Sequence, residues 1–251
     1  MLVATVLLYT GLAGCSILAV ALVMRYDLHR REPVHAIVTA IVGGALAMGM
    51  CMAAQNAFVQ ATGMEFEHDS VLKWALLAGV AEESAKFLTV CALAFILREH
   101  FDEPIDGLIY GSMAGLGAAI LESAHIQGMP EHLTTLPREE PIRLLGHLVM
   151  GGIGGFGVGL VLHVSWRYLL IAALCLAVAI ALHIAWDVVA YRMADQTLPG
   201  EAPSFGYNAA SIALMIGGFF FFRTLASICP PSIDAITAPA NAPPPPVKPP
   251  M

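Results

Sequence analysis

Repeated long apolar stretches, each about the length that a helix needs to cross a bilayer, constrain this chain more than any other feature. A membrane-spanning helix takes about 20 mainly apolar residues. Backbone polar groups in lipid must also be satisfied internally, which favours helices. The pattern therefore predicts an all-α fold, a polytopic membrane helix bundle with about seven transmembrane helices. The predicted spans cover residues 1–24, 34–60, 71–97, 107–127, 142–163, 167–192 and 206–229.

The composition supports a membrane protein and excludes several other classes. Of the 251 residues, 58% are hydrophobic and only 12% are charged, whereas soluble domains carry roughly 25% charged residues. The formal net charge of −7 argues against a polybasic surface, so no nucleic-acid partner is expected. The lipid bilayer is the expected surrounding.

The domain organisation predicted from the sequence is simple. Residues 1–229 form one transmembrane helical bundle, and residues 230–251 form a proline-rich tail that we predict to be disordered, because proline at that density cannot continue a helix. Only Val164 to Trp166 separate the fifth and sixth spans. These two spans are therefore expected to form a tight helical hairpin.

The basic residues beside the spans predict an orientation. Lys and Arg are enriched on the cytoplasmic side of membrane proteins. One side of the predicted bundle receives more of them than the other, which places the N-terminus outside and the C-terminus in the cytoplasm. The richer side has Arg25, Arg30, Arg31, Arg98, Arg167, Arg223 and Lys248, and the other has Lys73, Arg138, Arg143 and Arg192.

Glycines are concentrated in the fourth and fifth spans. Gly111, Gly115 and Gly117 lie in the fourth, and six more lie between residues 151 and 159. Small residues let membrane helices approach closely. We expect these two helices to pack tightly and to hold polar side chains in a fixed register.

Ionisable residues interrupt the third to sixth spans. Each costs at least a few kcal/mol near the bilayer centre, so internal partners or a function must retain it. With a rise of 1.5 Å per residue, Glu82, Glu122, His147 and His183 all lie roughly 8–17 Å below the outer surface, which predicts one common site. The predicted site residues are Glu82, Glu83, Glu122, His147 and His183, with Lys86 and Asp187 in support.

Helical spacing suggests separate roles for the two neighbouring glutamates. Glu82 and Lys86 are four residues apart, in the favourable order for an ion pair. We therefore expect Glu82 to pair with Lys86 and Glu83 to act as general base, although Lys86 is also three residues from Glu83. His183 and Asp187 are four apart on another helix, so Asp187 could orient the imidazole or share in metal ligation.

These residues alone leave several functions open. The sequence has no His-Glu-x-x-His zincin motif and no Gly-x-Ser-x-Gly elbow. Buried Glu, His and Lys also build the ion paths of proton- or cation-coupled transporters. A non-catalytic membrane scaffold is another alternative, but a scaffold has no need for costly buried charges.

Four segments together resemble the PrsW family of intramembrane proteases, which is related to the CAAX-protease-like (CPBP) group. They cover about residues 1–190, and they differ from the family in that Ala118 replaces a frequent aromatic residue and Asp187 replaces a frequent Asn. The segments are Tyr26-Asp27 with Arg31-Glu32-Pro33; Glu82-Glu83-x-x-Lys86; Asp106-Gly107-x-x-Tyr110-Gly111 with Gly115-x-Gly117 and Glu122; and Arg143 with His147, followed by His183-x-x-x-Asp187.

The resemblance implies an intramembrane endopeptidase that cleaves membrane-anchored protein substrates in a bacterial inner membrane. The family's best-known role is the release of anti-sigma factors in signalling. Glu82 or Glu83 is the natural general base, and His147 and His183 could stabilise the oxyanion. Alternatively, His147 and His183 could bind zinc with Glu122 or one of the paired glutamates. The residue types permit both, and we favour the metal-free glutamate mechanism over zinc.

Overall fold

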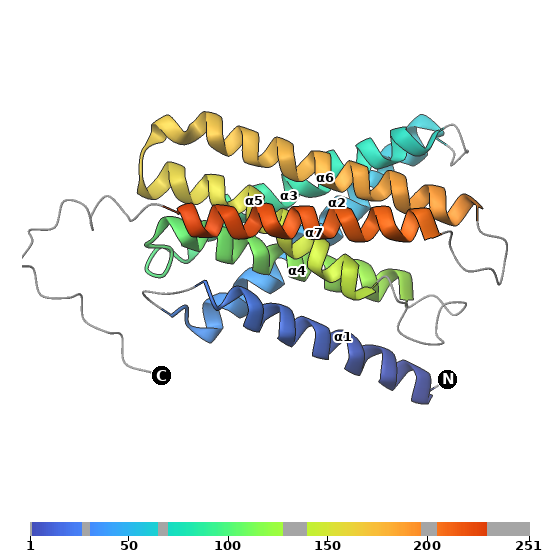
Figure 1. Ribbon diagram of the computed structural model, residues 1–251, viewed down its shortest axis with the longest axis horizontal. Helices are drawn as coiled ribbons and strands as arrows, with labels where there is room; N and C mark the ends of the chain where they lie inside the picture. The colour runs from blue at the N-terminus through green and yellow to red at the C-terminus, as the bar shows by residue number, and fades with distance from the viewer. Residues whose placement is uncertain (1, 27–30, 65–69, 128–139, 197–204, 230–251) are drawn as a thin grey trace, which may run out of the picture.

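The computed structural model describes residues 2–26, 31–64, 70–127, 140–196 and 205–229. All regular secondary structure in these ranges is helical (Figure 1). The helices are α1 (Leu2–Val23), α2 (Val34–Thr62), α3 (Val71–Ile96), α4 (Pro104–Gln127), α5 (Glu140–His163), the short 3-10 helix η3 (Trp166–Tyr168), α6 (Leu169–Gln196) and α7 (Phe205–Ile228).

The helical membrane bundle predicted from the apolar stretches is confirmed, and the helix bounds lie within a few residues of the predicted spans. Among the described residues, five helices are long and apolar enough to cross a membrane: α2, α4, α5, α6 and α7. In α1 the shorter segment Tyr9–Val23 is apolar. Helix α3 has a similar length but carries four charged residues, Lys73, Glu82, Glu83 and Lys86, and this charge separates it from the five.

The hairpin between α5 and α6 is as tight as predicted. The side chain of Ser165 accepts a hydrogen bond from the backbone N–H of Arg167, which caps η3 and turns the chain into α6. The predicted tail, residues 230–251, lies outside the described residues.

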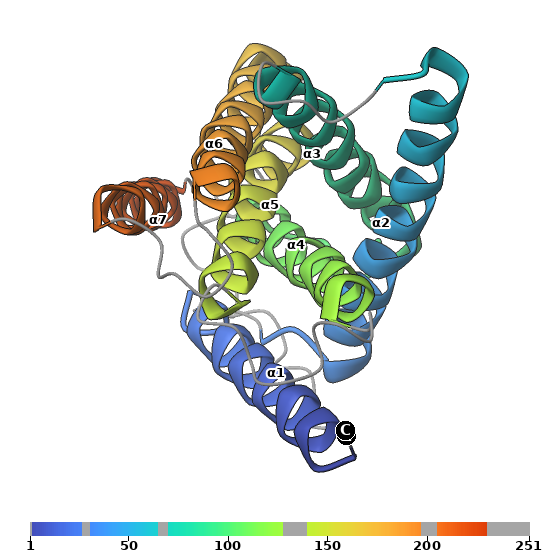
Figure 2. The same cartoon turned by 90° about the vertical axis from the view of Figure 1, so that its right-hand side faces the viewer.

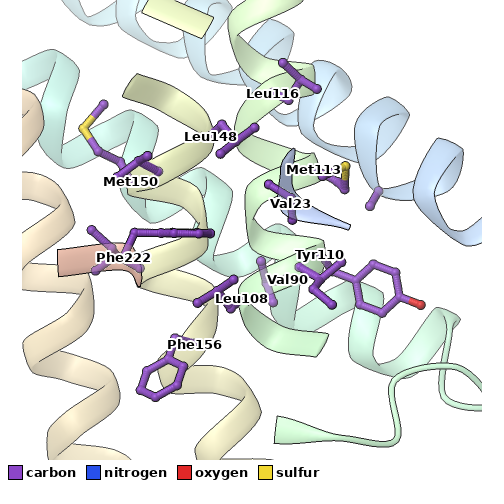
Figure 3. Packing of buried hydrophobic residues seen from close by; sticks show 14 of the residues in the cluster. Val23, Val90, Leu108, Tyr110, Met113, Leu116, Leu148, Met150, Phe156 and Phe222 are labelled. Carbon is purple, nitrogen blue, oxygen red and sulfur yellow. The ribbon is translucent and has the colours of Figure 1, made fainter. Parts of the chain in front are cut away.

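Helices α4 and α5 form the centre of the bundle. Figure 2, a view along the bundle, shows them surrounded by α1, α2, α3, α6 and α7. The two central helices are mostly buried, whereas much of α6 and α7 faces outward. Apolar side chains from several helices fill the space around α4 and α5, including those of Leu108, Met113, Leu148, Met150 and Phe222 (Figure 3).

Glycines bring the backbones of neighbouring helices into direct contact, as the sequence predicted. A Cβ atom added to Gly111 would lie 2.3 Å from the carbonyl oxygen of Gly151, and one added to Gly115 would lie 2.0 Å from that of His147. A Cβ on Gly117 would lie 1.9 Å from the carbonyl oxygen of Ile41 in α2. No side chain fits at these distances, so glycine fixes how α4 sits against α5 and α2.

Candidate active site

The ionisable side chains of α3, α4, α5 and α6 converge on one buried cluster. The rings of His147 (α5) and His183 (α6) meet edge to face with centroids 5.2 Å apart. Nε2 of His147 lies 3.1 Å from Oε2 of Glu122 on α4. Nδ1 of His183 lies 2.6 Å from Oε1 of Glu83 on α3. Side chains from four helices thus meet at one level of the bundle.

Glu83 is the most fully bonded carboxylate of the cluster. Its Oε1 accepts hydrogen bonds from Nζ of Lys86 at 2.5 Å and from Nδ1 of His183 at 2.6 Å. The side chain is almost completely buried. Two donors on one oxygen, one of them an ammonium, hold this carboxylate in place and leave it unsuited to accept a further proton.

The predicted pairing of the two glutamates is wrong. Lys86 pairs with Glu83, three residues before it, and not with Glu82. The reason is tertiary: Lys86 also contacts Nδ1 of His147 at 2.8 Å, and Glu83 also holds His183. Helical spacing alone makes Glu82 and Glu83 nearly equivalent partners for Lys86. The contacts with side chains of α5 and α6 therefore decide which of the two forms the ion pair.

Lys86 also restricts the tautomer of His147. An ammonium has no lone pair, so in its contact with Nδ1 the lysine donates and the imidazole accepts. A neutral His147 then carries its hydrogen on Nε2, the atom that faces Glu122. If His147 instead ligated a metal through Nε2, the hydrogen would have to sit on Nδ1, with Lys86 as a neutral amine. In the metal-bound form one proton moves from Lys86 to Nδ1 and the proton on Nε2 is lost, so this form of the site holds one proton fewer.

Glu82 occupies a different environment from its neighbour. Its Oε2 is buried but has no hydrogen-bond partner among the described residues. Nε2 of His183 is 3.7 Å away, too far for a hydrogen bond. The same Nε2 lies 3.5 Å from Oδ2 of Asp187, the residue predicted to orient this ring. Glu83, which accepts a hydrogen bond from Nδ1 of His183, therefore orients this ring from a shorter distance than Asp187 does.

Glu122 lies at the accessible edge of the cluster. Its side chain is 24% exposed, whereas that of His147 is 4% exposed. Its Oε2, although 3.1 Å from His147, is buried and lacks a well-aligned hydrogen bond. The Glu122 side chain is therefore partly accessible to water, while its Oε2 faces His147 inside the cluster.

A second set of residues supports Glu122 and was not among the predicted site residues. Nη1 of Arg143 lies 3.4 Å from Glu122, and Nη2 lies 3.6 Å from Glu140. Glu140 is fully buried and accepts a hydrogen bond from Ser123 on α4. Arg143 and Glu140 start α5 and share one side of it with His147 at spacings of three and four residues, a signal that the sequence contains.

Three side chains of the cluster could hold a metal ion together. One oxygen of Glu82 and one ring nitrogen each of His147 and His183 lie within 4.8 Å of one another, and all three residues are buried. Carboxylate and imidazole donors suit zinc. Of the carboxylates that the sequence offered as the third ligand, Glu122 or one of the paired glutamates, Glu82 is the one in this set. The buried Oε2 of Glu82, which makes no hydrogen bond among the described residues, fits the role of a metal ligand.

Charge also favours a cation at this position. The five carboxyl groups of Glu82, Glu83, Glu122, Glu140 and Asp187 outnumber the two basic side chains of Lys86 and Arg143. Uncompensated buried charge is strongly unfavourable. The excess must be balanced by protons on the carboxylates or histidines, or by a bound metal ion.

Comparison with known proteins identifies one related family. The family model described as "PrsW family intramembrane metalloprotease" matches residues 32–222, which include every residue of the cluster. Neither the curated proteins nor the solved structures contain a match to the chain.

Proposed function

This chain belongs to the PrsW family of intramembrane proteases, and we propose that it hydrolyses peptide bonds of membrane-anchored protein substrates at the cluster described above. The proposed site residues are Glu82, Glu83, Glu122, His147 and His183, with Lys86, Asp187 and Arg143 in support. The family places the protein in a membrane with membrane-embedded substrates. We further propose the inner membrane of a bacterium, and a role in signalling by release of a membrane-anchored regulator.

The observation that carries this proposal is the unequal bonding of the buried carboxylates. Oε1 of Glu83 accepts hydrogen bonds from both Lys86 and His183, whereas one buried oxygen each of Glu82 and Glu122 makes no hydrogen bond among the described residues. A buried polar atom without a partner is destabilising by about 1–3 kcal/mol. Two such atoms facing two histidines indicate a site prepared for a ligand, a proton or a reacting water.

The donor set fits a zinc ion, as the family's description as metalloproteases suggests, and we propose that Glu82, His147 and His183 hold it. When bound, zinc would supply Lewis acidity that activates water and polarises the scissile carbonyl. Glu83 would then accept a hydrogen bond from Nδ1 of His183, on the side of the ring away from the metal. A carboxylate commonly orients a metal-ligating histidine in this way.

Glu122 is the proposed general base. It is the more exposed of the two carboxylates with an uncommitted oxygen, and it lies beside His147. Arg143 contacts its other oxygen, so the carboxylate is held in one orientation. A base needs hydrogen-bond reach of the water whose proton it accepts, and Glu122 offers Oε2 for this. The same group can return the proton to the leaving amine.

Cleavage by purified protein reconstituted in lipid vesicles tests the proposed function. A membrane-anchored substrate with one transmembrane helix should be cut within or next to that helix, and the His183→Gln variant should not cut it. The matched control is His125→Gln, because His125 is an exposed histidine on α4 outside the cluster. Equal cleavage by the wild type and by His183→Gln would refute the site. Proton or cation flux without cleavage would favour the transporter alternative.

A further inference from the structure

A second pair of histidines lies beyond the C-terminal end of α3, whereas the candidate active site lies near the middle of this helix. His35 belongs to the first turn of α2, and His100 follows the end of α3. Their Nε2 atoms are 3.1 Å apart, and the rings meet edge to face with centroids 4.9 Å apart. The helical rise from Glu83 to Leu97, near the end of α3, is about 21 Å. The pair is therefore separate from the catalytic cluster.

From this pair we infer a metal site: His35 and His100 bind one divalent transition-metal ion of the kind that prefers imidazole, such as Zn²⁺, Ni²⁺ or Cu²⁺. The ion ties the first turn of α2 to the segment that follows α3. Water molecules complete its coordination. The inference concerns different residues from the proposed protease site and does not depend on it.

The distance between the two nitrogens carries the argument. Two Nε2 atoms 3.1 Å apart cannot both point a hydrogen at each other, so at least one presents a lone pair. With metal–nitrogen bonds of about 2.0–2.1 Å, nitrogens at this separation subtend about 95–102° at the metal. This angle lies between the ideal angles of octahedral and tetrahedral sites. The two rings therefore already have the spacing of neighbouring ligands on one ion.

Both histidines are carried by segments that the core holds in place. Ala36 and Ile37, which follow His35, are buried, as are Leu97 and Phe101 on either side of His100. Backbone hydrogen bonds from the N–H groups of His100 and Phe101 to the carbonyl of Leu97 fix the turn, at 2.7 and 2.8 Å. A pair fixed in this way loses little freedom when it binds a metal.

The exposure of the pair allows an ion to enter. The His35 side chain is exposed and His100 is partly exposed, so the metal can reach the nitrogens from water and keep water ligands. In the predicted orientation this end of the bundle faces the cytoplasm. Imidazole is a common ligand of zinc, copper and nickel.

The test is thermal unfolding of the full chain in detergent with and without Ni²⁺. It uses a His183→Gln background, which removes a proposed ligand of the catalytic metal. At free Ni²⁺ about 100-fold above its dissociation constant, the unfolding midpoint should rise by about 5–10 °C. His35→Gln or His100→Gln should each remove this rise, whereas the matched variant His125→Gln should keep it.

A spectroscopic measurement identifies the ligands directly. With one equivalent of Cu²⁺ bound in the same background, pulsed electron paramagnetic resonance should detect two coordinated imidazoles, and His35→Gln should reduce them to one or none. A Ni²⁺-induced rise that survives both substitutions would overturn the inference. So would the absence of any rise, because His35 and His100 would then form only a hydrogen bond. Neither result bears on peptide cleavage.

Discussion

The two ends of α4 carry buried polar clusters of opposite character. At its start, Tyr110 donates a hydrogen bond to Glu32, and Oδ2 of Asp106 accepts the backbone N–H groups of Asp102 at 2.8 Å and Glu103 at 2.6 Å. None of the buried side-chain oxygens of Glu32, Asp106 and Tyr110 lacks a partner. At the far end of α4 lies the cluster of Glu122, in which Oε2 of Glu82 and Oε2 of Glu122 make no hydrogen bond within the described part of the chain.

This difference separates a structural cluster from a reactive one. A satisfied buried network rigidifies the fold, whereas an unsatisfied one stores unfavourable free energy that a ligand or substrate can relieve. The residues at the start of α4 tie the chain before α2 to α4 and cap its first turn. Substitutions there should lower stability, and substitutions at the other end should lower activity.

The largest expected effect is that of Glu122→Gln at the reactive end. Loss of a general base lowers the cleavage rate by about 10²–10⁴-fold, while the unfolding midpoint should change little because Glu122 is partly exposed. The rate is measured in vesicles and the midpoint in detergent. Near-normal cleavage by this variant would remove Glu122 from the mechanism and weaken the contrast between the two clusters.

Removal of the metal should have the next largest effect. If Glu82, His147 and His183 hold zinc, chelation should reduce cleavage by at least about 100-fold, and added zinc should restore it. Elemental analysis of the same samples gives the zinc content. Full activity with less than about a tenth of a zinc per chain would exclude the zinc mechanism. It would instead support the metal-free glutamate mechanism that the sequence led us to favour.

Sequence reasoning predicted the helices and the membership of the cluster because both follow from helical geometry. The predicted span 34–60 corresponds to the helix Val34–Thr62, and the predicted span 142–163 corresponds to the helix Glu140–His163. Glu122 and His147 were assigned to one site from their common depth, and their side chains are 3.1 Å apart.

The pairing of the glutamates could not be derived from the sequence in the same way. Spacings of three and four residues both bring side chains together on a helix, so Glu82 and Glu83 were both suitable partners for Lys86. The choice depends on how α3 is rotated toward His147 and His183, which is a property of packing. Arg143 and Glu140 were missed as site residues for a related reason, because their partners Glu122 and Ser123 lie on another helix.

Identical substitutions at two glycines of α4 would sharpen the contrast between its ends. A Cβ at Gly115 meets the carbonyl oxygen of His147 at 2.0 Å, and one at Gly107 meets that of Gly155 at 2.3 Å. Gly115→Ala and Gly107→Ala should each lower the free energy of unfolding by about 1–3 kcal/mol. Only Gly115→Ala should also reduce cleavage, by about 10–100-fold, because it displaces His147.

The control for the glycine pair is Gly217→Ala on α7, where an added Cβ has nothing within 4 Å. This variant should unfold and cleave like the wild type. If Gly107→Ala impaired cleavage by folded protein as much as Gly115→Ala, the catalytic register would depend on the whole α4–α5 contact and not on its reactive end.

The smallest expected effect is that of Tyr110→Phe at the structural end. The substitution removes the donor to Glu32 and leaves a buried carboxylate less satisfied, so the free energy of unfolding should fall by about 1–3 kcal/mol. Cleavage per folded molecule should be unchanged. A selective loss of activity, with stability intact, would mean that the cluster at the start of α4 takes part in the reaction.

The central claim is that the two adjacent glutamates divide structural and reactive roles, and one paired measurement tests it most directly. Unfolding and cleavage are compared for Glu82→Gln and Glu83→Gln, with unfolding recorded after chelation. Glu83→Gln should lower the free energy of unfolding by about 3–5 kcal/mol, because it strands the buried Lys86 ammonium. Glu82→Gln should remain as stable as the wild type or become more stable, since it removes a carboxylate with an unsatisfied oxygen, and it should not cleave. The reverse result, an unstable but active Glu82→Gln and a stable but inactive Glu83→Gln, would contradict the account.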